Sequence, residues 1–233
     1  MMAGPGRALV CGEASVLHGQ LARLGRLRPQ LVISWGVCGG LDSRLRPGDL
    51  IVGSEIVSDG ASIATDKFVA SAIARRLTHL GSRVRVERLA GTNTPILTTH
   101  TKAKIHRATG AAAVDMESAT AARIALALRS PFAIVRAIAD PADRDLPPLV
   151  FKAVDADGRI NGAAVVRALV RSPGQFAGLC AVARDSWSAM SALRRARRPL
   201  DAVFLDLGAC PSDRALEGSI QDAVDASPDP EQS

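Results

Sequence analysis

The chain has 233 residues, of which 47% are hydrophobic and 22% charged, a composition typical of one large α/β domain with a sizeable core. Its net charge of +6 comes mostly from dispersed arginines, and only 3% of the residues are aromatic, so we expect no nucleic-acid partner. Because the sequence has no long apolar run and no signal-peptide core, we expect neither a transmembrane helix nor secretion.

The spacing of cysteine and histidine gives no sign of a metal site. The four cysteines are widely separated and lack a CxxC pair, which argues against zinc and against a disulfide framework. None of the four histidines has the spacing of a metal ligand. We therefore expect no metal, no cofactor and a reducing, cytoplasmic location. The positions concerned are Cys11, Cys38, Cys180, Cys210, His18, His79, His100 and His106.

Apolar runs alternate with stretches whose apolar residues recur at helical spacing, which predicts an α/β fold with a central, twisted, mixed β-sheet flanked by helices. We expect one domain at residues 1–198 and a largely disordered tail at 199–233. In chain order the expected elements are a strand at 8–11, a helix at 14–24, strands at 31–37 and 49–58, a helix at 68–80, a strand at 84–89, a helix at 101–109, a strand at 132–139, and helices at 165–170 and 176–193.

Glycines mark three local features. The continuous apolar run at residues 31–37 predicts a strand buried on both faces, and it leads into a glycine-rich segment at 36–40. A turn there would let the backbone approach a ligand closely, and a purely structural tight turn is the alternative. The segment matches neither a dinucleotide fingerprint nor a P-loop. We also expect a β-bulge at Gly53 and a helix C-cap at Gly110.

Two carboxylates stand at the ends of apolar, strand-like runs. Glu117 follows AAAV and opens a helix, while Asp140 ends the run IVRAIAD. Ligands of α/β sheets gather at the carboxyl ends of strands, so both side chains could face one crevice. One carboxylate could hold a vicinal diol and the other could protonate a leaving group, which together would cleave an N-glycosidic bond. Alternatively, Glu117 complements a helix N-terminus and Asp140, before Pro141, forms a turn.

Three motifs carry a family resemblance: GVCGGLDSRLRPGDLIV, AVDMESATAARIA and IVRAIADPAD. They resemble motifs of the purine nucleoside phosphorylase and methylthioadenosine/S-adenosylhomocysteine nucleosidase superfamily, in the same order, over residues 31–143. The later segment LPPLVFKAVDADGRINGAAVVRALVRSPGQFAGL resembles the hopanoid-associated phosphorylase branch. The resemblance implies the nucleoside phosphorylase fold and, for that branch, release of adenine from adenosylhopane with phosphate as co-substrate.

On the sugar side of the site, the resemblance implies that Glu117 binds the ribose 2′- and 3′-hydroxyls. Met116 would pack against the sugar, and Gly36 and Val37 lie where family members approach the sugar and the nucleophile. Val37 replaces a residue that is often Ser or Thr in the family, so this contact with the nucleophile is expected to be missing.

On the base side, the resemblance implies that Asp140 donates toward purine N7, and Arg136 lies where the family's nucleosidases have an arginine near the attacking water. Pro95 and Ile96 fall where the family has residues that line the base. Ala139 stands where many nucleosidases have a serine that orients the catalytic aspartate.

The family's first strand, with an arginine that holds phosphate or a glutamate that activates water, is expected before residue 8. This sequence has no such strand with its arginine or glutamate there, so we expect either a chain that is N-terminally truncated or mis-started, or a true sequence that lacks the strand. Three functions follow as expectations: phosphorolysis of adenosylhopane, hydrolysis of methylthioadenosine or S-adenosylhomocysteine, and nucleoside binding without catalysis.

The resemblance also implies a homo-oligomer. The basic run RRARR at residues 194–198 has two interpretations. It is either a solvated helix end or a peripheral contact with anionic lipid headgroups at the inner membrane face, which would suit a lipid substrate.

Overall fold

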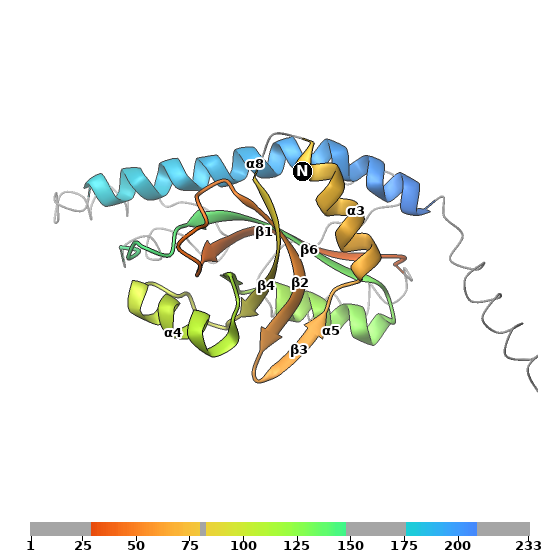
Figure 1. Ribbon diagram of the computed structural model, residues 1–233, viewed down its shortest axis with the longest axis horizontal. Helices are drawn as coiled ribbons and strands as arrows, with labels where there is room; N and C mark the ends of the chain where they lie inside the picture. The colour runs from red at the N-terminus through yellow and green to blue at the C-terminus, as the bar shows by residue number, and fades with distance from the viewer. Residues whose placement is uncertain (1–28, 80–82, 148–175, 209–233) are drawn as a thin grey trace, which may run out of the picture.

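The computed structural model describes residues 29–79, 83–147 and 176–208, and Figure 1 shows how their helices and strands are arranged. The elements expected at residues 8–11, 14–24 and 165–170 lie outside the described residues. In chain order the elements are β1 (Val32–Gly40), β2 (Leu50–Ser58), β3 (Ala61–Ala64), α3 (Lys67–Thr78), β4 (Val84–Gly91), α4 (Thr99–Thr109), β5 (Ala113–Asp115), α5 (Ser118–Leu128), β6 (Phe132–Asp140) and α8 (Phe176–Gly208).

The described strands form one mixed sheet in the order β3-β2-β4-β5-β1-β6, and β6 pairs in addition with β2. The pairs β1–β6, β2–β4 and β4–β5 are parallel, whereas β2–β3, β1–β5 and β2–β6 are antiparallel. Because β6 reaches back to β2, the five strands other than β3 close into a ring. The prediction of one α/β domain with a mixed central sheet is confirmed.

Both faces of the sheet are buried, and successive residues of a strand face opposite layers. In β2, Leu50 and Val52 pack against α3 and α8, while Ile51 packs toward α5. The same alternation holds in β6, where Val135 faces α8 and Ile134 faces α5. Figure 1 shows α3 and α8 above the sheet and α5 below it. Two-sided burial explains why these strands are continuous apolar runs in the sequence.

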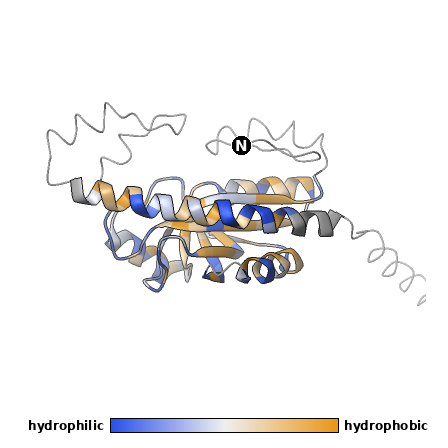
Figure 2. Cartoon of the chain, turned by 90° about the horizontal axis from the view of Figure 1, so that it is seen from above, coloured by the Kyte–Doolittle hydropathy of each residue, from blue (hydrophilic) through white to orange (hydrophobic). Residues whose placement is uncertain are grey.

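Helix α8 lies along the whole sheet in Figure 1, and Figure 2 shows hydrophilic and hydrophobic positions interleaved along it. Ala189, Ala192 and Ala196 are fully buried, so small side chains let the helix approach the sheet closely. The predicted end at residue 193 is wrong, because the helix continues through Pro199 to Gly208. Leu200 is buried in the core, so packing extends beyond the boundary predicted at residue 198.

The basic run of α8 presents its arginines outward. Arg194, Arg195, Arg197 and Arg198 are exposed, whereas Ala196 between them is buried. This part of α8 is therefore amphipathic, with one apolar face and one charged face. Within the described ranges, no helix is long and apolar enough to span a membrane.

Two further departures from the predicted boundaries have local causes. β1 does not end in a turn at residues 36–40 but continues to Gly40, because β5 and β6 both pair with its last residues. α4 begins two residues earlier than predicted, because the Oγ1 of Thr98 accepts a hydrogen bond from the backbone N–H of Thr101 at 3.2 Å. The C-cap predicted at Gly110 is confirmed by its φ of 66°, in the left-handed region.

The predicted bulge at Gly53 is also confirmed, since the β2–β4 register shifts between Gly53 and Glu55. A Cβ at position 53 would lie 2.7 Å from the Cβ of Ile134 and 3.0 Å from Cδ1 of Leu89. The missing side chain therefore allows β2 to pack closely on the layer formed by β4 and β6.

We predict that Gly53→Ala lowers the free energy of unfolding by about 1–3 kcal/mol, because the new methyl group meets the Cβ of Ile134 and forces the backbone of β2 or β6 to shift. Urea denaturation would measure the change. Ser54→Ala, at the exposed neighbouring position, is the matched control and should stay within about 0.5 kcal/mol of the wild type. Equal effects of the two variants would contradict this account.

The loop between β1 and β2 is held by Asp42, whose side chain is 7% exposed. Its Oδ1 accepts a hydrogen bond from the backbone N–H of Arg44 at 2.8 Å, and its Oδ2 lies 2.6 Å from the Arg44 guanidinium. Hydrogen bonds from the Arg44 side chain lower the pKa of Asp42 to about 2, against the opposing effect of burial.

This pair predicts a pH dependence of stability. The folded-state pKa of Asp42 lies below the ordinary aspartate value of about 3.9, so its stabilisation is fully present above that pH and is lost as the pH falls toward 2. Asp42→Asn should therefore be less stable than the wild type at about pH 7, and the difference should vanish near pH 2. Urea denaturation across this range, with exposed Asp143→Asn as the control, would test it. A difference that persists at the acid end would refute the assignment.

Candidate active site

The carboxyl-terminal part of β1 lies between two strands that carry the predicted functional residues. β6 runs parallel to β1 and places Arg136 opposite Gly36 and Asp140 opposite Gly39. β5 runs antiparallel on the other side, with Val114 opposite Gly39. The segment after β5 therefore returns along β1 toward Gly36, and the AVDMES motif meets Arg136 there.

Arg136 is buried, and every part of its guanidinium is engaged. Its side chain is 4% exposed, and Nε lies 2.6 Å from Oδ2 of Asp115, itself 1% exposed. Nη2 donates to Oγ of Ser34 at 2.7 Å and to Oγ of Ser118 at 3.0 Å. Nη1 donates to the carbonyl of Val37 at 3.3 Å. A buried guanidinium with this many partners is held in one orientation.

Gly36 provides the space that this orientation requires. A Cβ at position 36 would overlap Nη1 of Arg136. The glycine expected from the sequence to let a ligand approach thus also makes room for a side chain of the protein itself.

Asp115, rather than Glu117, caps helix α5. The Oδ1 of Asp115 accepts a hydrogen bond from the backbone N–H of Ser118 at 2.9 Å, and the Ser118 hydroxyl donates to Oδ2. Glu117 occupies the N-cap position but makes no capping hydrogen bond through its side chain. Glu117 therefore stands where its charge can complement the helix N-terminus, as the alternative interpretation expects, but its carboxylate oxygens are not used as a cap.

Glu117 lies at the accessible edge of this cluster. Its side chain is 42% exposed, and Oε2 lies 3.4 Å from Nη1 of Arg136. Partial burial raises the pKa of Glu117, and the Arg136 guanidinium opposes that rise. Met116 and Val37 are exposed beside it by 37% and 39%. These three side chains give the site an anionic group bordered by apolar surface.

A second bulge sets the position of Asp140. The β1–β6 register pairs Cys38 with Ile138 and Gly39 with Asp140, so Ala139 is the extra residue on β6. Such bulges turn the following side chain away from its regular direction. Oδ1 of Asp140 is buried and accepts no hydrogen bond among the described residues. Desolvation raises the pKa of Asp140, while a hydrogen bond from Lys102 lowers it.

Lys102 is the partner of Asp140. It projects from α4, is 1% exposed, and places Nζ 2.6 Å from Oδ2 of Asp140. The same ammonium donates to the carbonyls of Pro141 at 2.7 Å and Arg144 at 2.8 Å. Asp140 therefore uses one oxygen for Lys102 and leaves the other without a partner.

The loop that carries Pro95 and Ile96 is joined to the segment after Asp140. Pro95 is exposed, and Ile96 is half-buried against the small cluster that contains Val114. The backbone N–H of Leu146 donates to the carbonyl of Leu97 at 2.8 Å, just beyond this pair. The structure thus brings the predicted base-lining residues to the same end of the sheet as Asp140.

Cys38 lies within the cluster but is unsuited to nucleophilic chemistry. It is 5% exposed, and its thiol donates to the carbonyl of Ala137 at 3.7 Å. Burial, reinforced by the negative charge of Asp115, raises the pKa of the thiol far above its usual range. The reactive thiolate is therefore disfavoured at neutral pH.

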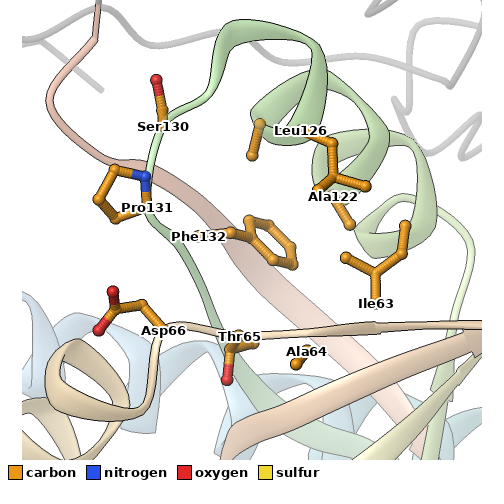
Figure 3. Close-up of a pocket in the computed structure, with 10 residues that line it drawn as sticks. Ile63, Ala64, Thr65, Asp66, Ala122, Leu126, Ser130, Pro131 and Phe132 are labelled. Atoms are coloured by element: carbon orange, nitrogen blue, oxygen red, sulfur yellow. The ribbon is translucent and has the colours of Figure 1, made fainter. Parts of the chain in front are cut away.

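The described residues also contain a cavity of about 220 Å³ away from this cluster. Figure 3 shows the ring of Phe132 pointing into it between Ile63 and Ala122. Phe132 begins β6 and Asp140 ends it, so the cavity and Asp140 lie at opposite ends of one strand. In the same described ranges, no group of three or more His, Cys, Asp or Glu side chains is placed to hold a metal ion.

Comparison with known proteins identifies the family. The model of the family described as the phosphorylase superfamily matches residues 8–171. The chain belongs to the phosphorylase superfamily. A curated relative, the 5′-methylthioadenosine/S-adenosylhomocysteine nucleosidase of Psychromonas ingrahamii, is 29% identical over 143 residues. The match covers 52% of this chain and 61% of the relative, so it spans less than two thirds of the relative's length.

Solved structures share the superfamily fold with this chain. The methylthioadenosine/S-adenosylhomocysteine nucleosidase of Campylobacter jejuni has a TM-score of 0.53 and 22% identity, covering 67% of this chain and 73% of that one. The Helicobacter pylori nucleosidase with butyl-thio-DADMe-Immucillin-A has a TM-score of 0.56 and 16% identity, covering 82% and 75%. The futalosine hydrolase of the same species has a TM-score of 0.51 and 18% identity, covering 55% and 65%.

Sequence reasoning missed four residues that support the predicted ones: Ser34, Lys102, Asp115 and Ser118. Asp115 stands three residues before Ser118, which is the spacing of a side-chain cap, so this signal could have been found. Lys102 gave no such signal, because it lies in a helix with other exposed basic residues and only the tertiary fold buries it.

The buried and accessible carboxylates of AVDMES should respond differently to neutralisation. Asp115→Asn leaves the guanidinium of Arg136 without its closest counter-charge, so we predict a loss of about 3–5 kcal/mol in unfolding free energy. Glu117→Gln, at an exposed and longer pair, should cost less than about 1 kcal/mol. Urea denaturation of both variants would measure the contrast. A larger loss for Glu117→Gln would show that the roles are reversed.

Proposed function

We propose that this protein cleaves the N-glycosidic bond of an adenosine-bearing substrate, with Glu117 and Asp140 on either side of that bond. The observation that supports this most directly is the pairing along β1. Arg136, which contacts Glu117, lies opposite Gly36, and Asp140 lies opposite Gly39. Three residues of strand correspond to roughly 10 Å, which leaves room for a ribosyl group between two side chains that reach inward.

In this proposal Glu117 acts on the sugar. An accessible carboxylate can accept hydrogen bonds from both hydroxyls of a vicinal diol, and its charge stabilises the cationic ribosyl group that forms as the bond breaks. Arg136 touches Glu117 but is neutralised by Asp115, so it holds Glu117 in place without cancelling its charge. Met116 and Val37 offer apolar surface to the sugar.

Asp140 acts on the base. Its unpartnered Oδ1 is a polar atom already removed from water, which favours a hydrogen bond to the incoming purine. Protonation at N7 makes adenine a neutral leaving group, and general-acid assistance of this kind contributes typically 10²–10⁴-fold to a rate. Ile96 and Pro95 would border the base on the adjoining loop.

The preferred reaction is phosphorolysis of adenosylhopane, with phosphate attacking C1′ and adenine released. The resemblance of residues 146–179 to the hopanoid-associated branch supports it. Hydrolysis of methylthioadenosine or S-adenosylhomocysteine is the second candidate, favoured by the curated relative named as that nucleosidase. Binding of a nucleoside without turnover is the third.

The proposal includes a cytoplasmic homo-oligomer that touches the membrane peripherally. Phe68 and Trp187 are exposed by 66% and 69%, which supports a protein partner for these surfaces. The exposed arginines at 194–198 support a contact with anionic lipid headgroups, where a lipid-linked substrate would be found.

Measuring adenine release from adenosylhopane and from methylthioadenosine, each with and without phosphate, tests the function. Phosphate-dependent release from adenosylhopane is the expected result. Release from methylthioadenosine without phosphate would establish the second candidate instead. Nucleoside binding with no release from either substrate would leave only the third.

Within an active preparation, we predict that Asp140→Asn lowers kcat/KM about 10²–10⁴-fold, because the amide cannot supply a proton. The exposed Asp143→Asn is the matched control and should retain activity. Thermal unfolding of both variants checks that the loss is not one of folding. Unchanged turnover by Asp140→Asn would remove Asp140 from the mechanism.

A further inference from the structure

Lys102 occupies a site in which both of its protonation states are satisfied. As an ammonium it has three N–H donors, and three oxygens receive them: Oδ2 of Asp140 and the carbonyls of Pro141 and Arg144. As a neutral amine it would have two N–H donors and one lone pair. The two carbonyls would then keep their hydrogen bonds, and a protonated Asp140 would donate to the lone pair.

This arrangement allows only one of the three protons to move. A backbone carbonyl is not a proton acceptor in this chemistry, whereas the carboxylate of Asp140 is. Moving that proton leaves no buried N–H of Lys102 unpaired, because the two carbonyls receive the two donors that remain, so the transfer avoids the penalty for orphaned donors. Because Lys102 is 1% exposed, water does not compete for the proton.

The charged groups nearest the Lys102–Asp140 pair have partners of their own. Arg144 and Asp185 are the other charged groups that act on Asp140, and they pair with each other at 2.5 Å. The nearby thiol of Cys38 stays neutral by burial. Asp145 faces Lys102 from the same loop and accepts a hydrogen bond from the backbone N–H of Thr99 at 2.6 Å.

We propose that Lys102 is the proton reservoir of the site, and that Asp140 relays the proton of Lys102 to the leaving purine. This inference rests on the proposed N-glycosidic cleavage. In the resting protein Lys102 is an ammonium and Asp140 a carboxylate. When the purine displaces water, one proton passes from Nζ to the carboxylate, and both groups become neutral.

The second half of the relay is coupled to bond cleavage. The C1′–N9 bond breaks and its electron pair moves onto the purine ring, while the lone pair of N7 takes the proton from Asp140. A half-turn of the carboxyl group about Cβ–Cγ presents the proton on the side of the unpartnered oxygen and leaves the other oxygen facing Lys102. Adenine leaves neutral and Asp140 is again a carboxylate. After product release Asp140 takes a proton from solvent and passes it to the amine of Lys102.

A substrate that needs no proton separates this role from a structural one. The base of an N7-methylated purine nucleoside already carries a positive charge and leaves as a neutral molecule without protonation. Lys102→Gln should lose about 10²–10⁴-fold in kcat/KM on the adenine-bearing substrate but less than about tenfold on the N7-methylated nucleoside. The exposed Lys104→Gln, on the same helix, is the matched control and should retain both activities.

Two more variants decide between a relay and a fixed charge. Lys102→Arg keeps the positive charge but holds its proton too tightly to release it, so the relay predicts no rescue on the adenine-bearing substrate. Rescue by arginine would overturn the relay. In an Asp140→Asn background, Lys102→Gln should cause no further loss, because Lys102 acts only through Asp140.

The possible failures are distinguishable. Equal losses on both substrates would overturn the relay and leave N-glycosidic cleavage standing. A wild-type protein that is inactive on both substrates would overturn the proposed function, and the relay with it. If Lys102→Gln unfolds below the assay temperature, Lys102→Arg replaces it in the test. The relay then predicts that Lys102→Arg loses activity on the adenine-bearing substrate but not on the N7-methylated nucleoside.

Discussion

The guanidinium of Arg136 is buried in the central sheet, and the site depends on how this charge is balanced. Asp115 supplies the counter-charge at 2.6 Å, and the hydroxyls of Ser34 and Ser118 satisfy Nη2. The same Asp115 caps α5, so one carboxylate both neutralises the arginine and begins the helix that follows. Breaking a buried ion pair costs much more free energy than breaking an exposed one. The cluster is therefore a rigid support for Glu117, which lies at its accessible edge.

The three carboxylates near β1 differ because their surroundings differ. Asp115 is fully enclosed and paired, so its contacts are with Arg136 and the start of α5. Glu117 is half exposed and only loosely paired, which leaves its charge available to a polar ligand. Asp140 is enclosed but half satisfied, with Lys102 on one oxygen and an unpartnered second oxygen. Three carboxylates close together in the fold thus have different environments because their burial and their partners differ.

Much of the fold could be predicted from the sequence, because strands buried on both faces are continuous apolar runs. The core of β1, all of β2 and nearly all of β6 were found in this way, as were the bulge at Gly53 and the cap at Gly110. The short apolar run before Glu117 indicated a strand there, but β5 has only three residues and forms through pairing with both β1 and β4, so the local pattern could not give its bounds. The end of β1 was misjudged for the same reason, since its glycines favour a turn until neighbouring strands pair with them.

The candidate site was predictable only in part. The sequence motifs alone indicated Glu117, Asp140 and Arg136 as site residues. The structure brings Glu117 and Arg136 into contact. The roles of these residues in catalysis stay predictions. Lys102 could not be found in this way, because its burial depends on the segment after Asp140 folding back over α4.

The closed ring of strands has a consequence for the order of folding. β6 pairs with β1 across 100 residues of chain, from Val32 to Phe132, and with β2 across about 85. The loop-closure entropy of such distant pairings is spent before their contacts form, so folds built on them assemble slowly. During synthesis β1 and β2 emerge long before their partner. The ring therefore cannot close, and Arg136 and Asp140 cannot reach their places beside β1, until β6 has left the ribosome.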